Sequence, residues 1–295
     1  MTEIELMGRV REAGLSRVAH DLERLLKPSI RIKAHPVDEA TLALGASKFG
    51  GVPDLPPEIG WPERNGQRLD LIAQLNLSEI TSLKPPAYQL SLLDVGSNLS
   101  ALDALPQAGI LYFFYDVAEQ PGGYKPEDRG GWKVVHYDGA SSRLKHCEAA
   151  SALPEDGPLP ACRLEFAKEV TLPDLEEALM DRLWLSDAEE DAYREVIKGV
   201  ETSTQICHRL LGYPQIIQNA MERQCAVLSH GLADNNANRR IYEPEEVEWH
   251  LLLQVDSDDN AEMSWGDVGR LYFWIRKAHF RAHDFEGVWL VLQCH

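Results

Sequence analysis

Three short apolar blocks occur twice along this chain, in the same order. The first set is LIAQLN (71–76), GILYFFY (109–115) and WKVVHY (132–137), and the second set is LLLQVD (251–256), GRLYFWI (269–275) and WLVLQC (289–294). Runs of this length that are rich in Val, Ile, Tyr, Phe and Trp are typical of buried strands. Because six buried strands must pair with one another, the repeat constrains the fold more than any other feature.

The repeat predicts an internal duplication. A Gly-x-Pro tripeptide precedes each set, and the blocks keep their order while the spacers differ in length. This is the pattern of a structural repeat whose loops have diverged. The alternative is that buried strands resemble one another by composition alone. If the duplication is real, Gln74 should be placed like Gln254, and Trp132 like Trp289.

Helical patterns flank the two sets of strands. Apolar residues recur at helical spacing over residues 4–26, where Gly14 and Ser16 divide the pattern into two helices. Residues 171–199 are also predicted to be helical, with a capping box that starts at Ser186. We therefore predict an α+β fold in which two β-rich repeats share one core and helices flank them.

This reading divides the 295 residues into four regions of one compact unit. They are an N-terminal helical region (1–28), a first β-rich repeat (29–165), an acidic helical connection (166–203) and a second β-rich repeat (204–295). Within the last region, residues 215–228 are predicted to form a helix and residues 234–240 a turn-rich loop. His279 and His283, four residues apart, are expected on a short surface helix.

Charge and cysteine content narrow the functional classes. The formal net charge of −18 argues against nucleic-acid binding and is compatible with a basic protein partner or a bound cation. The five cysteines form no C-x-x-C pair, which fits a reducing compartment. No apolar run approaches the roughly 20 residues of a membrane span. We expect a cytoplasmic protein without membrane contact, and the oligomeric state is not readable.

Several strings together carry a family resemblance. SKFGGVPDLPPEIGWP, LIAQLNLSEI, GILYFFYD, HRLLGYPQIIQ, WHLLLQVDSDD and WGDVGRLYFWI resemble the bacterial YwqG-like family, a domain of unknown function. The resemblance runs from about residue 47 to the C-terminus. It implies an α+β fold and a bacterial, cytoplasmic protein, and it brings no established reaction. Some members lie near toxin–immunity gene clusters, which implies a protein-binding role.

The proline-rich stretch that follows Ser47 is the first candidate site. Its prolines exclude a helix or a central strand, and its glycine pair allows backbone angles closed to other residues. In the functional reading, the Lys48 ammonium and the Gly50 and Gly51 amides bind an anion. In the alternative reading, the stretch is a rigid connection that packs on the sheet.

The acidic loop at residues 256–267 is the second candidate site. Asp256, Asp258 and Asn260 occupy positions 1, 3 and 5 of a twelve-residue loop, and Asp267 occupies position 12. These oxygen ligands match much of the calcium-loop template, so we predict a divalent cation, calcium first. Ala261 stands where the template has Gly, and the flanks predict strands instead of helices. The alternative is an acidic turn whose Asp side chains cap backbone amides.

Acidic residues are most concentrated at residues 174–201. Only three bases accompany its ten acidic residues, so this segment is either a solvated helix face or a docking face for a basic partner.

The chain contains no Walker loop, no G-x-G-x-x-G and no G-x-S-x-G motif. We therefore favour a non-catalytic binding protein, with a metal-assisted enzyme whose site lies between the two repeats as the alternative.

Overall fold

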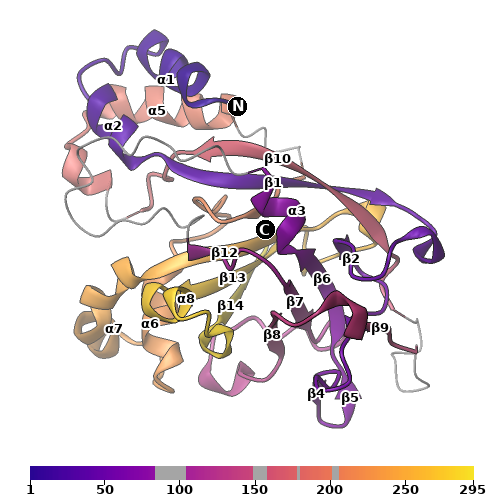
Figure 1. The fold of residues 1–295 in the computed structure, drawn as a ribbon. Coiled ribbons are helices and arrows are strands. Elements are labelled where there is room, and N and C mark those ends of the chain that lie inside the picture. Colours follow the sequence, from indigo (N-terminus) through magenta and orange to yellow (C-terminus); the bar gives the residue numbers. More distant parts are fainter. Residues whose placement is uncertain (84–103, 149–157, 178–179, 201–205) are drawn as a thin grey trace.

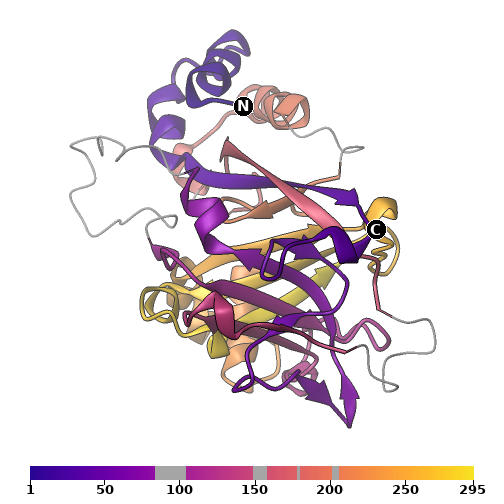
Figure 2. The ribbon, with the colours of Figure 1, turned by 45° about the vertical axis from the view of Figure 1, so that its right-hand side comes forward.

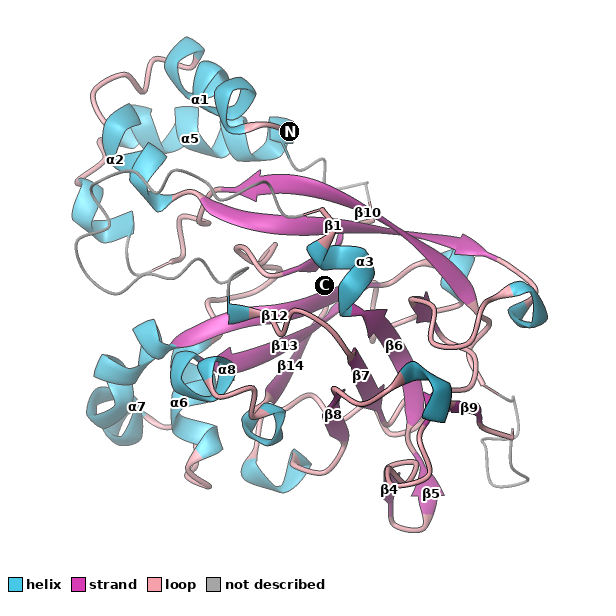
Figure 3. Cartoon of the chain, viewed as in Figure 1, coloured by secondary structure: helices cyan, strands magenta, loops and turns pink. Residues whose placement is uncertain are grey.

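The molecule is organised around one large antiparallel sheet (Figures 1 and 3). In the computed structural model, residues 1–83, 104–148, 158–177, 180–200 and 206–295 are described. The described strands form a ten-stranded sheet of order β14-β13-β12-β11-β1-β10-β2-β6-β7-β8. Their bounds are β1 (Lys27–Pro36), β2 (Lys48–Phe49), β6 (Asp70–Asn76), β7 (Ile110–Tyr115), β8 (Trp132–Tyr137), β10 (Cys162–Thr171), β11 (His208–Leu210), β12 (Trp249–Asp256), β13 (Arg270–Arg276) and β14 (Trp289–Gln293).

All six strands predicted from the repeated blocks are confirmed. The first set forms β6, β7 and β8, and the second set forms β12, β13 and β14. The pairing between β6 and β7 shifts register between Leu71 and Ala73, and that between β12 and β13 shifts between Leu251 and Leu253. The register shift lies at the same point of each set, as a β-bulge shared by the two flanks would place it.

The long strands β1 and β10 form the middle of the sheet. They pair in antiparallel register over ten positions, from Lys27↔Thr171 to Pro36↔Cys162. On one side β1 pairs with β11, and on the other side β10 pairs with β2. Each flank therefore begins with a short strand and continues with three longer ones.

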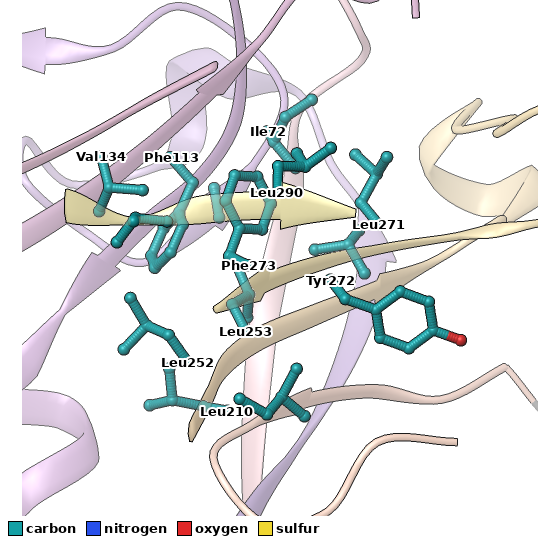
Figure 4. Close-up of a cluster of buried hydrophobic side chains, with 14 of the residues drawn as sticks. Ile72, Phe113, Val134, Leu210, Leu252, Leu253, Leu271, Tyr272, Phe273 and Leu290 are labelled. Carbon is teal, nitrogen blue, oxygen red and sulfur yellow. The ribbon is translucent and has the colours of Figure 1, made fainter. Parts of the chain in front are cut away.

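The two flanks curl toward each other, so the sheet is nearly closed around one apolar core. Figure 4 shows side chains from both flanks in this core, among them Phe113 of β7 and Phe273 of β13. Their rings meet edge to face with centroids 5.1 Å apart. Burying apolar side chains of both flanks in one core is the main favourable contribution to folding.

Trp132 and Trp289 join the outer strands of the two flanks. Their rings pack edge to face at 5.1 Å. The indole N–H of Trp132 donates to the carbonyl of Val288, and that of Trp289 donates to the carbonyl of Gly123. Each tryptophan thus donates a hydrogen bond to the opposite half of the chain.

Helices cover the sheet in separate groups (Figures 1 and 2). The described α-helices are α1 (Glu3–Glu12), α2 (Ala19–Leu25), α3 (Leu77–Thr81), α5 (Asp187–Val200), α6 (Glu222–Ser229), α7 (Asn236–Tyr242) and α8 (Lys277–Arg281). The N-terminal helices and α5 share a second apolar cluster that includes Leu22, Tyr193 and Val196. This cluster lies beside one end of β1 and β10. None of the helices in the described part of the chain has the length and apolarity of a membrane span.

The described strands also form two ribbons of two strands each, outside the large sheet. The first pairs β3 (Asp54–Leu55) with β9 (Lys145–His146), and the second pairs β4 (Glu63–Arg64) with β5 (Gln67–Arg68).

The predicted helix at residues 171–199 is wrong in its first half. Strand β10 continues to Thr171 because it pairs with β1 along its whole length, and it crosses residue 165, where we drew the end of the first repeat. A turn and a short 3₁₀ helix (Met180–Leu183) follow, and α5 begins only at Asp187. The capping box is confirmed, since the Ser186 amide donates to the Glu189 carboxylate and the Glu189 amide donates to the Ser186 hydroxyl. The boundary between residues 203 and 204 lies outside the described residues.

Two further local predictions are wrong for identifiable reasons. Residues 236–242 form α7 instead of a loop because the Asn235 side chain accepts from the amides of Ala237 and Asn238. The helix expected at residues 215–228 begins only at Glu222, since the amides before it donate to side chains of β12 and β14.

Candidate functional site

Lys48, the charged residue of the first candidate site, is buried on β2. The prediction that this stretch contains no central strand is wrong at its start, because β2 pairs on both sides and ends at Phe49, before the first proline. Its ammonium group donates to the Glu39 carboxylate at 2.8 Å and to the Val52 carbonyl at 2.6 Å. The Asp54 carboxylate lies at 3.8 Å. The chain itself thus supplies the negative charge and the hydrogen-bond acceptors that a buried ammonium group requires.

The amides of Gly50 and Gly51 donate to backbone carbonyls, those of Ile72 at 3.3 Å and Leu159 at 2.7 Å. Both glycines have left-handed φ angles, and a Cβ on Gly51 would lie 2.1 Å from the Glu39 carboxylate. Glycine is therefore required here for close approach. An anion at Lys48 would have to displace Glu39, and the anion site stays a prediction.

A pair that the sequence did not suggest lies beside Lys48. His146 of β9 and Asp54 of β3 face each other, with Nδ1 and Oδ1 2.9 Å apart. Burial alone would raise the pKa of Asp54, but the Lys48 charge and hydrogen bonds from Gln74 and Gly45 lower it. About half of the His146 side chain is exposed (51%). A buried carboxylate that orients an accessible imidazole can position it for proton transfer or metal binding.

In the acidic loop, Asp256 faces inward. One carboxylate oxygen lies 3.1 Å from Nε of Arg270, and the other accepts from the amide of Cys207 at 2.9 Å. A base and a backbone amide on neighbouring strands therefore balance this carboxylate. Arg276, the other base near the loop in sequence, contacts Glu245 at 2.5 Å.

Asp258 is also buried and contacts a histidine. Its carboxylate lies 3.1 Å from Nε2 of His208 and accepts from the amide of Asn260 at 2.9 Å. Burial would raise the pKa of Asp258, while these hydrogen bonds lower it. The Asp258 side chain thus caps a backbone amide, as in the alternative reading of the loop.

The remaining predicted ligands, Asn260 and Asp267, are exposed. Among the described residues, no group of three or more His, Cys, Asp or Glu side chains has the arrangement of a metal site. A cation at the loop would have to compete with Arg270 for Asp256 and with His208 for Asp258. Calcium binding at Asp256, Asp258, Asn260 and Asp267 stays a prediction.

The two histidines expected on one helix are separated. His279 lies on α8 and contacts Asp284 at 2.8 Å, whereas His283 follows the helix in a left-handed conformation with φ 53°. Their four-residue spacing therefore does not place both rings on one helical face.

A groove of about 650 Å³ lies beside the N-terminal end of α5. Its lining residues are Leu175, Glu176, Met180, Asp181, Arg182, Trp184, Leu185, Glu190 and Arg194. Trp184 is 86% exposed and has a left-handed φ of 47°. Such a backbone angle is rare for a bulky residue, so neighbouring contacts must hold it.

Those contacts come from Arg17. Its guanidinium donates to the Trp184 carbonyl at 3.2 Å and to both carboxylate oxygens of Glu189 at 2.8 and 2.7 Å. The hydrogen bonds from Arg17 and from the Ser186 amide lower the pKa of Glu189 to about 2. Glu189 therefore stays ionised and holds Arg17 against the backbone of Trp184.

The acidic face of α5 includes several local ion pairs. Arg194 lies between Glu190 at 3.1 Å and Asp191 at 3.0 Å, and Lys198 contacts Glu195 at 2.8 Å. Pairs of this kind along an exposed helix contribute little to stability. Residues 178–179 and 201 of the predicted acidic segment lie outside the described part of the chain.

A smaller hollow of about 180 Å³ lies between β8 and residues 285–288, where the two flanks meet. Its apolar lining includes Trp132, Val134 and Phe285. Arg129 and Lys133 also line it. It is smaller than the roughly 300–1,000 Å³ that is usual for small-molecule sites.

Comparison with protein families identifies the chain at a coarse level. The family model described as "Domain of unknown function (DUF1963)" matches residues 47–294. Among curated proteins, none is similar enough to match. The matched segment contains the whole sheet except β1, together with the acidic loop and the groove beside α5. The chain therefore belongs to the DUF1963 family, a domain of unknown function.

Proposed function

We propose that this protein is a non-catalytic interaction module that binds a basic segment of a partner protein in the groove beside α5. The observation that carries the proposal is Trp184, whose side chain is 86% exposed at the edge of that groove. Tryptophan is enriched among the residues that dominate binding energy at protein interfaces. Exposure of so large an aromatic side chain favours a surface that a partner covers.

The charge of the groove favours a basic partner. Glu176, Asp181 and Glu190 line it, against Arg182 and Arg194, and the whole chain has a net charge of −18. Arg194 is engaged by Glu190 and Asp191. A positively charged segment would therefore meet a complementary field, which accelerates association and excludes acidic competitors.

The groove is also organised before binding. Arg17 connects the carbonyl of Trp184 to Glu189, which itself belongs to the capping box of α5. A surface whose conformation is already held loses less entropy on association. This preorganisation supports a recognition role for Trp184.

A catalytic role is the second candidate, and the His146–Asp54 pair favours it. In this alternative, the accessible ring nitrogen of His146 accepts a proton from substrate or binds a metal ion. The hollow between β8 and residues 285–288, at the junction of the halves, is lined by neither residue of this pair. This separation and the small volume of the hollow make the interaction module the better-supported function.

Two finer proposals concern origin. The shared order of strands and the bulges at equivalent positions support an internal duplication of one β-rich unit. The strings that resemble the YwqG-like family support a bacterial, cytoplasmic protein with a role related to toxin–immunity systems. In that role, the basic segment would belong to a partner protein from such a system.

A peptide-display selection tests the interaction module. Random peptides are selected on the immobilised protein at low salt, and enriched peptides are measured by fluorescence anisotropy. We expect Lys- and Arg-containing peptides with neighbouring apolar residues, whose affinity falls as salt rises. Trp184→Ala should weaken them at least about tenfold, as loss of a central aromatic contact does.

Ile241→Ala is the matched control, since Ile241 is an exposed apolar side chain (66%) on α7, outside the groove. It should leave the affinity unchanged. Enriched peptides that are neutral or acidic, or that bind Trp184→Ala as tightly as the wild type, would contradict the proposal.

A further inference from the structure

Strand β14 is the last strand of the ten-stranded sheet, so its outer edge has no strand partner among the described strands. Its sequence, WLVLQ, contains no charged residue and no proline, and all five residues are buried. An apolar edge strand of this kind pairs readily with strands of other molecules, and natural proteins protect such edges with charges, prolines or a covering segment. The protection of β14 must therefore come from another part of the chain.

Leu290 and Leu292 define the outer edge of β14. In an antiparallel sheet, the backbone groups of alternate residues point toward the same neighbour. The amide of Leu292 donates away from the sheet, to the carbonyl of Gly122 at 3.0 Å. The backbone groups of Leu290, two residues earlier, therefore also point outward, and the residues on either side of these two leucines face β13. A further strand would pair with Leu290 and Leu292.

Residues 120–124, in the loop between β7 and β8, cover both leucines, and we call this segment the strap. The Tyr124 hydroxyl donates to the Leu292 carbonyl. Gly123 is buried with a left-handed φ of 70°, and a Cβ on it would lie 1.8 Å from the Leu290 carbonyl oxygen. Only glycine therefore fits between the strap and β14, and the strap occupies the place of a pairing strand.

Side-chain hydrogen bonds attach the strap to the second half of the chain. Gln120 donates to the Ser264 carbonyl at 3.1 Å and accepts from the Gly266 amide at 2.9 Å. The Gly123 carbonyl accepts from the Gln224 side chain at 3.1 Å. In the described part of the chain, one backbone hydrogen bond joins the strap to β14. A regular strand would form more of these bonds, so it could compete with the strap for the edge.

We propose that the outer edge of β14 is a docking surface for a second copy of this chain, and that the strap keeps this surface closed. With a two-fold axis at Val291, Leu290 of one copy lies opposite Leu292 of the other, and each such pair exchanges two backbone hydrogen bonds. The edge is self-complementary, because this pairing places apolar side chains opposite each other and brings no like charges together. The inference is independent of the groove beside α5.

Gly123→Ala should open the strap, because the added methyl group has no room beside the Leu290 carbonyl. Gly130→Ala is the matched control: Gly130 lies in the same loop and also has a left-handed φ (97°), but a Cβ there would meet nothing within 4 Å. Sedimentation velocity over a concentration series measures self-association of the full chain. The dimer dissociation constant should be at least about tenfold lower for Gly123→Ala than for the wild type or Gly130→Ala, because a closed strap reduces the fraction of chains able to pair.

Val291→Cys identifies the edge at which the copies meet. In the proposed dimer, the two copies of residue 291 form a non-hydrogen-bonded pair with Cα atoms about 4.5 Å apart, which is within the range of a disulfide. Val291→Cys combined with Gly123→Ala should therefore give a covalent dimer on oxidation. Val291→Cys combined with Gly130→Ala, and Gly123→Ala alone, should give little of it. These controls account for the five native cysteines.

Tyr124→Phe serves if Gly123→Ala fails to fold. It removes the hydroxyl that donates to the Leu292 carbonyl and should shift the dimer dissociation constant in the same direction by a smaller factor. Equal self-association of the wild type, the strap variant and Gly130→Ala overturns the proposal. Stronger self-association without a disulfide in the Val291→Cys variant also overturns it, because the copies would then meet at another surface.

Discussion

Gln74 and Gln254 make the same hydrogen bonds on opposite flanks of the sheet. Oε1 of Gln74 accepts from the amide of Asp54 at 2.9 Å, and Oε1 of Gln254 accepts from the amide of Gln215 at 2.8 Å. Nε2 of each donates to a backbone carbonyl. Both side chains are fully buried. The two side chains therefore make corresponding bonds to the backbone, and each glutamine attaches the loop after the first strand of its flank to the sheet.

Replacing either glutamine by leucine should destabilise the fold. The change leaves a buried amide and a buried carbonyl without partners, so we expect a loss of about 2–4 kcal/mol in the free energy of unfolding for each variant. Urea unfolding measures this. A neutral effect at one position and a large effect at the other would contradict the equivalence.

Replacement by glutamate should reduce the stability of the fold by different amounts at the two positions. Nε2 of Gln74 also donates to the Asp54 carboxylate at 2.9 Å, so Gln74→Glu places two carboxyl groups in contact. Gln254→Glu has no such neighbour among its described hydrogen-bond partners. We therefore expect the larger loss of stability for Gln74→Glu at pH 7, and a smaller difference between the two variants at pH 4. Equal losses at both pH values would count against this interpretation.

Trp132 and Trp289 should be energetically coupled. Their rings are in contact, and each donates to the opposite half. A double-mutant cycle with Trp132→Phe and Trp289→Phe should give a coupling energy of about 1 kcal/mol. Trp61→Phe is a suitable comparison partner, because the Trp61 indole donates within its own half, to the Leu69 carbonyl. Additive effects of Trp132→Phe and Trp289→Phe would show that the closure does not depend on this contact.

Calcium binding at the acidic loop should be tested at Asp267. Asp258→Ala removes the carboxylate partner of the buried His208 and should lower stability with or without metal. Asp267 is exposed, so Asp267→Asn isolates the metal effect. If the loop binds calcium, a hundredfold excess over the dissociation constant adds about 2.7 kcal/mol to the free energy of unfolding. Wild-type melts in calcium and in chelator should then differ, and those of Asp267→Asn should not; identical wild-type melts would leave the loop as a turn.

Asp70 should make the fold more stable at acidic pH. It is 5% exposed, and its pKa is raised to about 6, because burial and, to a smaller extent, the nearby Asp116 outweigh the lowering by the hydrogen bond from the Val117 amide. The folded pKa lies above the unfolded value, so the ionised carboxylate costs free energy above pH 6 that is recovered as pH falls toward 4. That cost is at most about 3 kcal/mol.

Asp70→Asn should therefore raise the free energy of unfolding at pH 7.5 and change it little at pH 4. The Asn side-chain oxygen can still accept from the Val117 amide. Asp138→Asn, an exposed substitution on the same flank, is the control and should have little effect at either pH. An Asp70→Asn protein no more stable than the wild type at pH 7.5 would argue that Asp70 is fully solvated when ionised.

The local pattern of the chain determined its strands. The repeated blocks are short, mostly apolar and rich in β-branched and aromatic residues, which is typical of buried strands. All six form strands as predicted. The capping box at Ser186 and Glu189 could also be predicted from the sequence, because its hydrogen bonds join residues only three positions apart.

Tertiary pairing decided where helices begin and end. Residues 215–218 have a helical pattern but do not start α6, because side chains of Gln254 and Gln293 take their backbone amides. Thr171 lies on β10 instead of a helix because β1 supplies a partner along the whole strand. Pairing partners that are this far apart in sequence leave no pattern in the local sequence from which the ends of the helices could be predicted.

The residues of the candidate sites were likewise visible in the sequence, whereas their partners were decided by the tertiary structure. The sequence by itself identified Lys48 and the acidic residues at 256–267, since residue type and spacing are visible in a string. Only the tertiary structure paired Lys48 with Glu39, Asp256 with Arg270 and Asp258 with His208. It also exposed Trp184 and placed His146 beside Asp54, 92 positions apart along the chain. The physical reason is that burial and charge balance depend on through-space neighbours, which the folded sheet assembles from distant segments.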